Sequence, residues 1–220
     1  QDLINQQTAG QTIFNTINLV PGVNFTNTDP FGSSGGQIRM RGFDGARISL
    51  TFDGAPLNDT GNYAIFSNQM MDPELISRAN VNMGATDVDS PTASATGGTI
   101  NYITAVPEED WRLQLQPSVG DFNYWRLFGR LDTGSFGPAD TRLFAAASFQ
   151  EYDQFVGPGE LQKEQYNVRL YQPLGNSGDF MSLAFHWNEN RNHFYSQGTL
   201  TDWNANPDFA NNDTCAFDTT

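Results

Sequence analysis

Positive charge is scarce in this sequence: 11 Lys and Arg stand against 25 Asp and Glu, which leaves a net charge of −14. This scarcity excludes a nucleic-acid partner, because proteins bind phosphates with clustered basic side chains. Long apolar runs are also missing, and no stretch approaches the roughly 18 residues of a membrane-spanning helix. A strand that crosses a membrane needs only about 10 residues of alternating hydropathy, so membrane strands are not excluded.

Side chains for catalysis or metal binding are equally few. His186 and His193 are the only histidines, and their spacing matches no zinc site. Asp87 and Asp89 lack the glycine and terminal glutamate of a calcium-binding EF-hand loop. Cys215 is the only cysteine, so it is either free or paired with a residue beyond this sequence. The sequence therefore predicts no enzyme, no cofactor and no metal site.

What the sequence has instead is 21 glycines, 13% aromatic residues and many short alternating segments, which is typical of β-rich proteins. In the first half, one helix is predicted at Thr8–Leu19, capped by Thr8 and ended by Pro21-Gly22. One helical turn is predicted at 73–76, with Asp72 as its N-cap. The strands expected in this half are Gln37–Gly42, Ala46–Phe52, Arg78–Met83 and Thr99–Thr104, and the long loops are 24–36 and 57–72.

The segment Gln37–Asn58 is the most informative part of the first half. Phe43-Asp44-Gly45 separates two alternating runs and predicts a hairpin or a tight turn between them. Asp53-Gly54 predicts a second tight turn at the end of the second run. Arg39 and Arg41 share one face of the first strand, opposite the apolar face.

Four pieces of sequence carry a resemblance to a known family. The order is Pro-Gly-Val at 21–23, Ile-Arg-x-Arg-Gly-Phe at 38–43, Arg47 with Asp-Gly-x-Pro-Leu at 53–57, and Gly84-Ala85 followed by 97–104. Together they resemble the plug domain of TonB-dependent outer-membrane receptors. The resemblance implies a plug domain over residues 1–106, from which the first plug strand and the energy-coupling box are missing.

From Trp111 onward the sequence pattern changes, and apolar and polar residues alternate in five segments. These are 111–116, 124–131, 143–150, 166–171 and 181–188. Such strands fit an outer-membrane β-barrel and also a soluble antiparallel meander. After a plug-like domain the barrel is favoured, so the predicted fold class is an α+β plug domain followed by antiparallel transmembrane β-barrel strands over 107–220. The resemblance implies a full barrel of about 22 strands, so we expect the chain to be the front part of a longer one.

The resemblance implies active uptake of a scarce nutrient, most often a ferric siderophore, across the Gram-negative outer membrane. The plug gates the barrel and there is no chemical step. The implied partners are TonB in the periplasm with its inner-membrane motor, the lipid of the outer membrane, and a small-molecule ligand such as a ferric chelate. Residues Arg191–Thr220 are expected to be extracellular.

Ligand-binding residues are predicted on the two apical plug loops. They are Phe25, Asn27, Asp29, Phe31, Asn58, Asp59, Asn62 and Tyr63, and they suit a polar ligand with an apolar body. The resemblance also implies that Arg39, Arg41 and Arg47 anchor the plug to carboxylates of the barrel. Turns and close backbone approaches are expected at Gly42, Asp53, Gly54, Gly97 and Gly98.

Other functions also fit parts of the sequence. The same fold could serve as a structural scaffold barrel in an outer-membrane assembly, or take up a carbohydrate or cobalamin. A secreted soluble carbohydrate-binding or hydrolytic β domain would carry polar residues on both faces of 111–190. The apolar set at 143, 145, 147 and 149 counts against that last interpretation.

Overall fold

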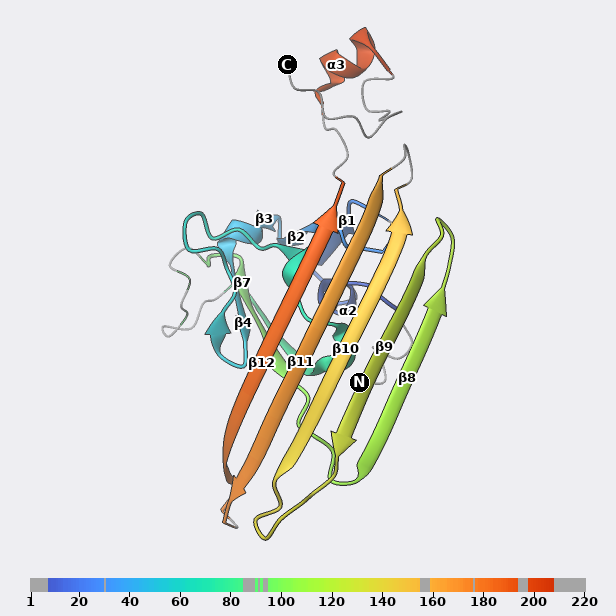
Figure 1. Cartoon of the computed structure of the whole chain (residues 1–220). Coiled ribbons are helices and arrows are strands. Elements are labelled where there is room, and N and C mark those ends of the chain that lie inside the picture. Colours follow the sequence, from blue (N-terminus) through green and yellow to red (C-terminus); the bar gives the residue numbers. More distant parts are fainter. Residues whose placement is uncertain are drawn as a thin grey trace.

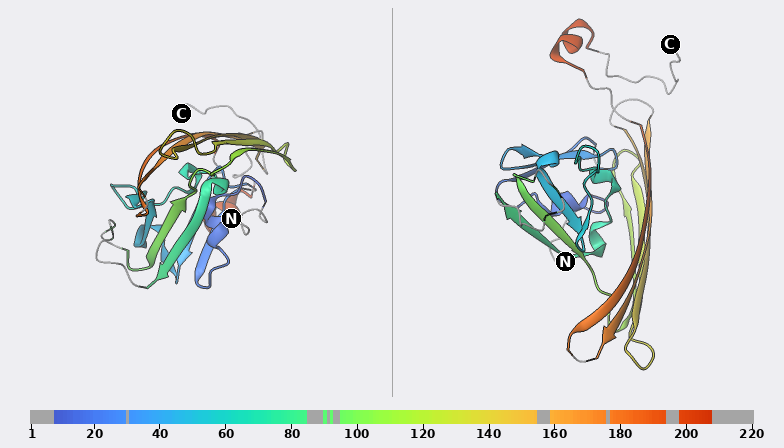
Figure 2. Two further views of the ribbon diagram at one scale, coloured as in Figure 1. Left: turned by 90° about the horizontal axis from the view of Figure 1, so that it is seen from below. Right: turned by 90° about the vertical axis from the view of Figure 1, so that its left-hand side faces the viewer.

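A computed structural model describes residues 8–29, 31–84, 90, 92, 95–154, 159–175, 177–193 and 198–207 (Figure 1). The described residues between 8 and 105 form an N-terminal unit of two small sheets and a short helix. The residues after 110 form a long antiparallel sheet and a second short helix. Figure 2 shows the N-terminal unit packed against the concave face of the long sheet. Among the described residues, no helix is long and apolar enough to cross a membrane.

The N-terminal unit contains helix α2 and strands β1 to β7. Their bounds are α2 Ile13–Ile17, β1 Val23–Asn27, β2 Gly36–Met40, β3 Phe43–Asp44, β4 Ile48–Phe52, β5 Ala55–Pro56, β6 Ile76–Met83 and β7 Gly98–Thr104. One sheet has the strand order β1-β2-β3, and the other has the order β5-β4-β7-β6. Three 3-10 turns lie between these strands, at Gly45–Arg47, Ser67–Gln69 and Pro73–Leu75.

At Asp44-Gly45 the hairpin alternative is wrong, whereas a tight turn does form there. The chain reverses earlier, at Arg41-Gly42, where both residues have positive φ and Met40 pairs with Phe43. Gly45–Arg47 then forms a 3-10 turn that carries β4 into the second sheet, where it pairs in parallel with β7. The turn predicted at Asp53-Gly54 is confirmed, since it joins β4 to β5 with φ of 45° and 85°.

Two other boundaries of the N-terminal unit also differ from the prediction. Helix α2 begins after Thr12 rather than at Thr8, because Gly10 has a φ of 80° that no helix permits. Residues 24–36 are not a single loop, since β1 pairs with β2 and only the residues between them form the loop. In β1 exposed polar residues alternate with buried apolar ones. Because the polar residues outnumber the apolar ones, the segment was predicted as a loop.

The core of the N-terminal unit lies between helix α2 and the two sheets. Ile13, Phe14 and Ile17 of α2 are buried, which confirms the apolar face predicted for the helix. Phe25 packs against Phe14, with their ring centroids 5.3 Å apart. The buried hydroxyl of Tyr102 on β7 donates to the Ile13 carbonyl oxygen at 3.0 Å, which ties the helix to the second sheet.

The long sheet has the strand order β12-β11-β10-β9-β8, and each strand is antiparallel to its neighbours. The bounds are β8 Trp111–Val119, β9 Trp125–Thr133, β10 Arg142–Asp153, β11 Glu160–Leu174 and β12 Asp179–Asn192. All five predicted strands are confirmed, and each is longer than predicted, β11 and β12 most of all. These two strands also take in residues 160–165, 172–174, 179–180 and 189–192, which the alternating segments did not include.

The two faces of the long sheet differ in polarity. The face turned away from the N-terminal unit exposes large apolar side chains, including those of Leu115, Leu127, Leu183 and Phe185. The buried side chains on the face toward the unit include many polar ones: Arg126, Arg130, Asp132, Gln150, Lys163, Gln165, Asn167 and Arg169. Water-soluble proteins bury apolar rather than charged side chains, so this distribution is reversed.

The segment expected to be extracellular, Arg191–Thr220, contains regular structure among its described residues. Strand β12 continues to Asn192, and helix α3 spans Leu200–Ala205. Thr199 and Asp202 form a reciprocal capping box at the start of α3, which nucleates this short helix. Cys215 and the predicted acidic pair Asp87 and Asp89 lie outside the described residues.

Candidate functional site

The inner face of the long sheet meets the N-terminal unit along a polar contact surface, here called the seam. Its most buried member is Arg126 on β9, which donates to both carboxylate oxygens of Glu74 at 2.7 and 3.0 Å. A second ion pair joins Arg126 to Asp72 at 3.3 Å. All three side chains are excluded from water, so each charge depends on its partners. Asp72 precedes the predicted helical turn and Glu74 lies within it, but the Asp72 side chain makes no cap hydrogen bond.

Strand β11 contributes the second part of the seam. Lys163, which is the only lysine of the chain, donates to the Met70 carbonyl oxygen at 3.2 Å, and Gln165 donates to the same oxygen at 2.6 Å. The Gln165 side-chain oxygen accepts a bond from the Asp72 backbone N–H at 2.9 Å. The backbone of residues 70–72 is therefore held by side chains of the long sheet.

Arg169, further along β11, forms the third part of the seam. It lies 3.3 Å from the Asp53 carboxylate and donates to the Thr104 carbonyl oxygen at 3.2 Å. Asp53 also accepts from the Thr104 backbone N–H at 3.0 Å. The residue predicted only as part of a turn thus links β4, β7 and the long sheet.

The loop between β1 and β2 forms the fourth part of the seam. The buried Asp29 carboxylate accepts from the backbone N–H groups of Phe31, at 2.8 Å, and of Ser34, at 2.7 Å. It also accepts from the hydroxyl of Tyr152 on β10. The Phe31 ring stacks on Tyr124 with a centroid separation of 3.8 Å. This loop is therefore organised by the long sheet.

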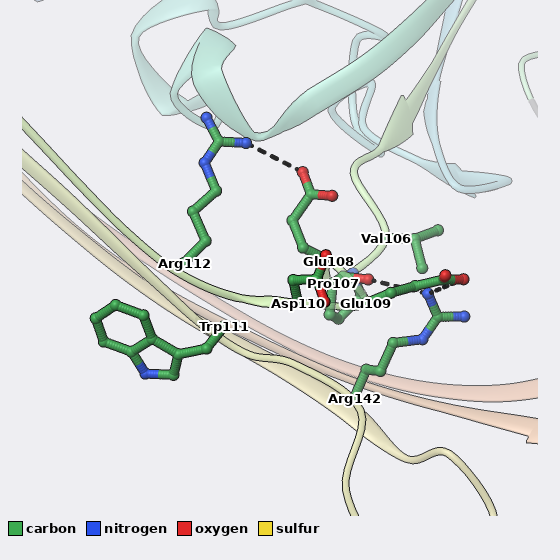
Figure 3. Close-up of a pocket in the computed structure, with 8 residues that line it drawn as sticks. All are labelled: Val106, Pro107, Glu108, Glu109, Asp110, Trp111, Arg112 and Arg142. Carbon is green, nitrogen blue, oxygen red and sulfur yellow. Dashed lines mark hydrogen bonds and ion pairs between the residues drawn. The ribbon is translucent and has the colours of Figure 1, made fainter.

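Residues 106–112 connect the N-terminal unit to β8 and line a pocket of about 630 Å³ (Figure 3). Arg112 reaches back to Glu108 at 3.2 Å, and Arg142 of β10 reaches Glu109 at the same distance. Both pairs include a solvent-exposed carboxylate, so each contributes little to stability.

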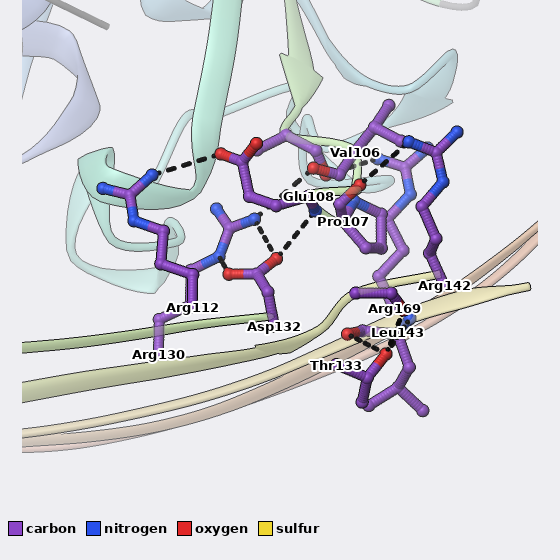
Figure 4. Close-up of polar contacts among 12 residues, drawn as sticks. Val106, Pro107, Glu108, Arg112, Arg130, Asp132, Thr133, Arg142, Leu143 and Arg169 are labelled. Atoms are coloured by element: carbon purple, nitrogen blue, oxygen red, sulfur yellow. Dashed lines mark hydrogen bonds and ion pairs between the residues drawn. The ribbon is translucent and has the colours of Figure 1, made fainter. Parts of the chain in front are cut away.

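A buried pair lies beneath this connection. Arg130 donates two hydrogen bonds to Asp132 on the same strand, at 2.8 and 2.9 Å (Figure 4). Asp132 also accepts from the Glu108 backbone N–H at 3.0 Å, and the Arg130 guanidinium lies 4.4 Å from the Phe144 ring centroid. These contacts hold the chain where it enters the long sheet.

Comparison with known proteins assigns the first of the two parts. Residues 1–99 match the family model described as TonB-dependent Receptor Plug Domain. This part of the chain is a TonB-dependent receptor plug domain. The match covers residues 1–99 of the 220 residues and agrees with the resemblance carried by the four pieces of sequence. No curated protein sequence matches the chain significantly.

Solved structures resemble both parts together. The pyoverdine outer membrane receptor FpvA from Pseudomonas aeruginosa PAO1 has a TM-score of 0.66 at 21% identity, over 82% of this chain and 25% of its own. The FrpB iron transporter from Neisseria meningitidis has a TM-score of 0.65 at 16% identity, over 84% and 30%. The copper transporter OprC has a TM-score of 0.66 at 16% identity, over 84% and 29%. The chain thus spans between a quarter and a third of these structures and shares their fold: a plug followed by antiparallel strands.

The predicted ligand residues of the first plug loop are largely committed to internal contacts. Phe25 is 5% exposed in the plug core and Asp29 is 4% exposed at the seam, so neither presents surface to a ligand. Phe31 is half-buried against Tyr124. Asn27 is half-buried at the end of β1, and its side-chain oxygen accepts no hydrogen bond from any described residue.

The second plug loop is closer to the prediction. Asn58 links the loop to β4, because its amide donates to the Ile48 and Tyr63 carbonyl oxygens at 2.8 and 2.9 Å. Asp59 and Asn62 are exposed, and each accepts a bond from a nearby backbone N–H. Tyr63 is half-buried with a φ of 59°. Asp59, Asn62 and Tyr63 stay predicted ligand contacts.

The three arginines predicted as plug anchors lie on the surface of the plug. Arg39, Arg41 and Arg47 are exposed, and none makes an ion pair within the described part of the chain. Their anchoring role stays a prediction. The prediction placed cations on the plug and carboxylates on the barrel. The ion pairs of the seam have the opposite arrangement, with carboxylates on the plug and cations on the sheet.

The glycines predicted for close approach are placed as expected. A Cβ on Gly98 would lie 2.1 Å from the Asn82 carbonyl oxygen, and one on Gly97 would lie 2.9 Å from the Arg47 carbonyl oxygen. Gly54 and Gly42 have positive φ in their turns. Only glycine permits these backbone contacts without displacement.

The sequence analysis missed the seam residues. Arg126, Lys163 and Arg169 fall on the polar side of alternating strands, and they include the single lysine. Charged residues at the inward positions of strands are the signal that could have identified them. The partners of Arg126 on the plug, Asp72 and Glu74, carried no such pattern.

Proposed function

We propose that this chain is the plug and first barrel strands of a receptor that takes up a scarce nutrient across the Gram-negative outer membrane, with a ferric siderophore as the first candidate ligand. The observation that carries this proposal is the plug domain seated against a sheet that is apolar outside and polar inside. An apolar outer face suits lipid, and a polar inner face suits a hydrated plug that must move.

The arrangement within the membrane follows from the same family. We place the boundary between the two domains at 106/107, with β8–β12 as the first strands of a barrel of about 22. TonB and its inner-membrane motor pull on the plug from the periplasm, and the described residues of the C-terminal part, 191–193 and 198–207, face the outside. Asp59, Asn62 and Tyr63 are the plug residues that we retain as ligand contacts.

Force and ligand act on the plug through the seam. Its carboxylates and backbone carbonyls are held by charged and amide side chains rather than by a packed apolar core. Hydrogen bonds of this kind can be exchanged for water as the plug shifts, at a smaller net cost than exposing apolar surface. A polar seam therefore allows the plug to occupy two positions relative to the long sheet.

Uptake can be tested in the organism that carries the gene. Deleting the gene should abolish accumulation of one radiolabelled ferric siderophore, and restoring the gene should recover it. Collapsing the proton-motive force should stop uptake but leave binding at the cell surface. A protein that is soluble without detergent, or a deletion strain that is unchanged in uptake across a siderophore panel, would contradict the proposal.

A further inference from the structure

A pocket of about 510 Å³ lies at the seam beside β12, and none of the predicted ligand residues lines it. The lining residues are Asn68 and Gln69 from the plug, and Asn188, Asn190 and Asn192 from β12. The three asparagines occupy alternate positions, so all of them project from the inner face of the strand. Every lining side chain is therefore an uncharged carboxamide.

The hydrogen bonds of these amides are distributed unevenly. Their nitrogens hold the plug: Asn190 donates to the Asn68 carbonyl oxygen at 2.9 Å, and Asn192 donates to the Ser33 carbonyl oxygen at 2.6 Å. Their oxygens are less occupied, since the side-chain oxygens of Asn190 and Asn192 are buried and accept no hydrogen bond within the described part of the chain. A buried acceptor without a partner is unfavourable, so these atoms favour a ligand that brings a donor.

Charge around the pocket disfavours an anion. Glu189 and Arg191 alternate with the asparagines on the other face of β12 and pair with each other at 2.8 Å. Lys163, opposite Asn190 on β11, already donates to the plug backbone. The chain as a whole carries −14, and a net negative charge repels anionic ligands.

We propose that this pocket binds an uncharged ligand through its O–H or N–H groups. The inference deepens the proposed uptake function and rests on it for the ligand's route. Two sources share this chemistry: a neutral oligosaccharide and an uncharged ferric chelate with peptide N–H groups. The same asparagines hold the plug backbone through their nitrogens, so ligand binding and plug retention use the same side chains.

The test measures binding to the detergent-purified receptor that contains this chain. The probes are ferrichrome as an uncharged ferric chelate, an array of neutral glucan, xylan and mannan oligosaccharides, and ferric citrate as an anion. We expect one uncharged class to bind, and Asn190→Ala to weaken that binding roughly tenfold, which is the effect of one lost hydrogen bond in a closed site. Asn80→Ala, an exposed asparagine on β6, is the matched control and should change nothing.

Gln69→Ala keeps the test decisive if Asn190→Ala does not fold, because Gln69 is exposed and lines the same pocket. The inference is overturned if no uncharged probe binds, if neither variant weakens binding, or if ferric citrate is the probe that they affect. Energy-dependent uptake of ferric citrate alone would overturn the inference and leave the uptake function standing. Binding of an uncharged probe that the cells do not take up would support the ligand class of the pocket and contradict the uptake function.

Discussion

Replacing Arg126 by methionine should loosen the plug from the long sheet. The substitution keeps an unbranched side chain of similar length but removes the cation that faces Asp72 and Glu74. Those carboxylates are 5% and 9% exposed, so water cannot take the place of the guanidinium. Breaking one partner of a buried ion pair costs about 3–5 kcal/mol, because the remaining charge stays desolvated.

Hydrogen exchange of the backbone amides in residues 70–76 measures this loss. A destabilisation of about 3–5 kcal/mol raises the local opening equilibrium by a factor of roughly 100 to roughly 4,000, since about 1.4 kcal/mol is tenfold. The measurement uses the detergent-purified receptor, with amides of the long sheet as an internal reference. Arg191→Met is the matched control, because Arg191 is 75% exposed and its pair with Glu189 contributes at most about 1 kcal/mol.

A second variant separates a buried charge from lost packing. Adding Glu74→Gln to Arg126→Met removes one charge of each sign and leaves Asp72 near Lys163. The cost should then fall to about 1–2 kcal/mol, because the Glu74 carboxylate that lost Arg126 has been removed as well. Exchange within about threefold of wild type in Arg126→Met, or no recovery in the double variant, would refute the reasoning.

Three further predictions concern the plug. Gly98→Ala should prevent correct pairing of β6 and β7, because its Cβ would lie 2.1 Å from a carbonyl oxygen. The measurement is the loss of native near-ultraviolet circular dichroism. Gly42→Ala is the control and should cost only about 1 kcal/mol, because Gly42 has a φ of +88° but open space around it. Burial raises the pKa of Tyr102 above the ordinary value of about 10. The stabilisation of the plug by neutral Tyr102 is therefore complete below about pH 10 and is lost as pH rises further. In wild type the denaturant concentration at the unfolding midpoint should fall above about pH 10, and in Tyr102→Phe this fall should be smaller. Tyr152→Phe should release the β1–β2 loop by about 1–3 kcal/mol, measured as faster amide exchange at residues 31–34.

Each of these has its own contrary outcome. A folded Gly98→Ala plug would show that β6 can move away from β7. An alkaline transition that Tyr102→Phe leaves unchanged would assign it to another group. Unchanged exchange in Tyr152→Phe would mean that Asp29 organises its loop without the long sheet.

The sequence by itself determined which residues share a face and where several of the turns occur. Alternation with period two assigns Leu127 and Arg126 to opposite sides of β9 without knowledge of any neighbour. Asp53-Gly54 forms its turn because both residues tolerate positive φ, which is a property of the local backbone. The plug could be recognised for the same reason, since its motifs are local turns and close approaches.

Only the tertiary structure decided which residues are partners. Asp44-Gly45 has the same local chemistry as Asp53-Gly54, yet β4 leaves β2 and pairs with β7, because the packing of the second sheet outweighs a favourable turn. Arg126 meets Glu74 across 52 positions of sequence. Alternation says that a side chain points inward but not what it meets there, so the seam and its amide pocket exist only once the plug lies against the sheet.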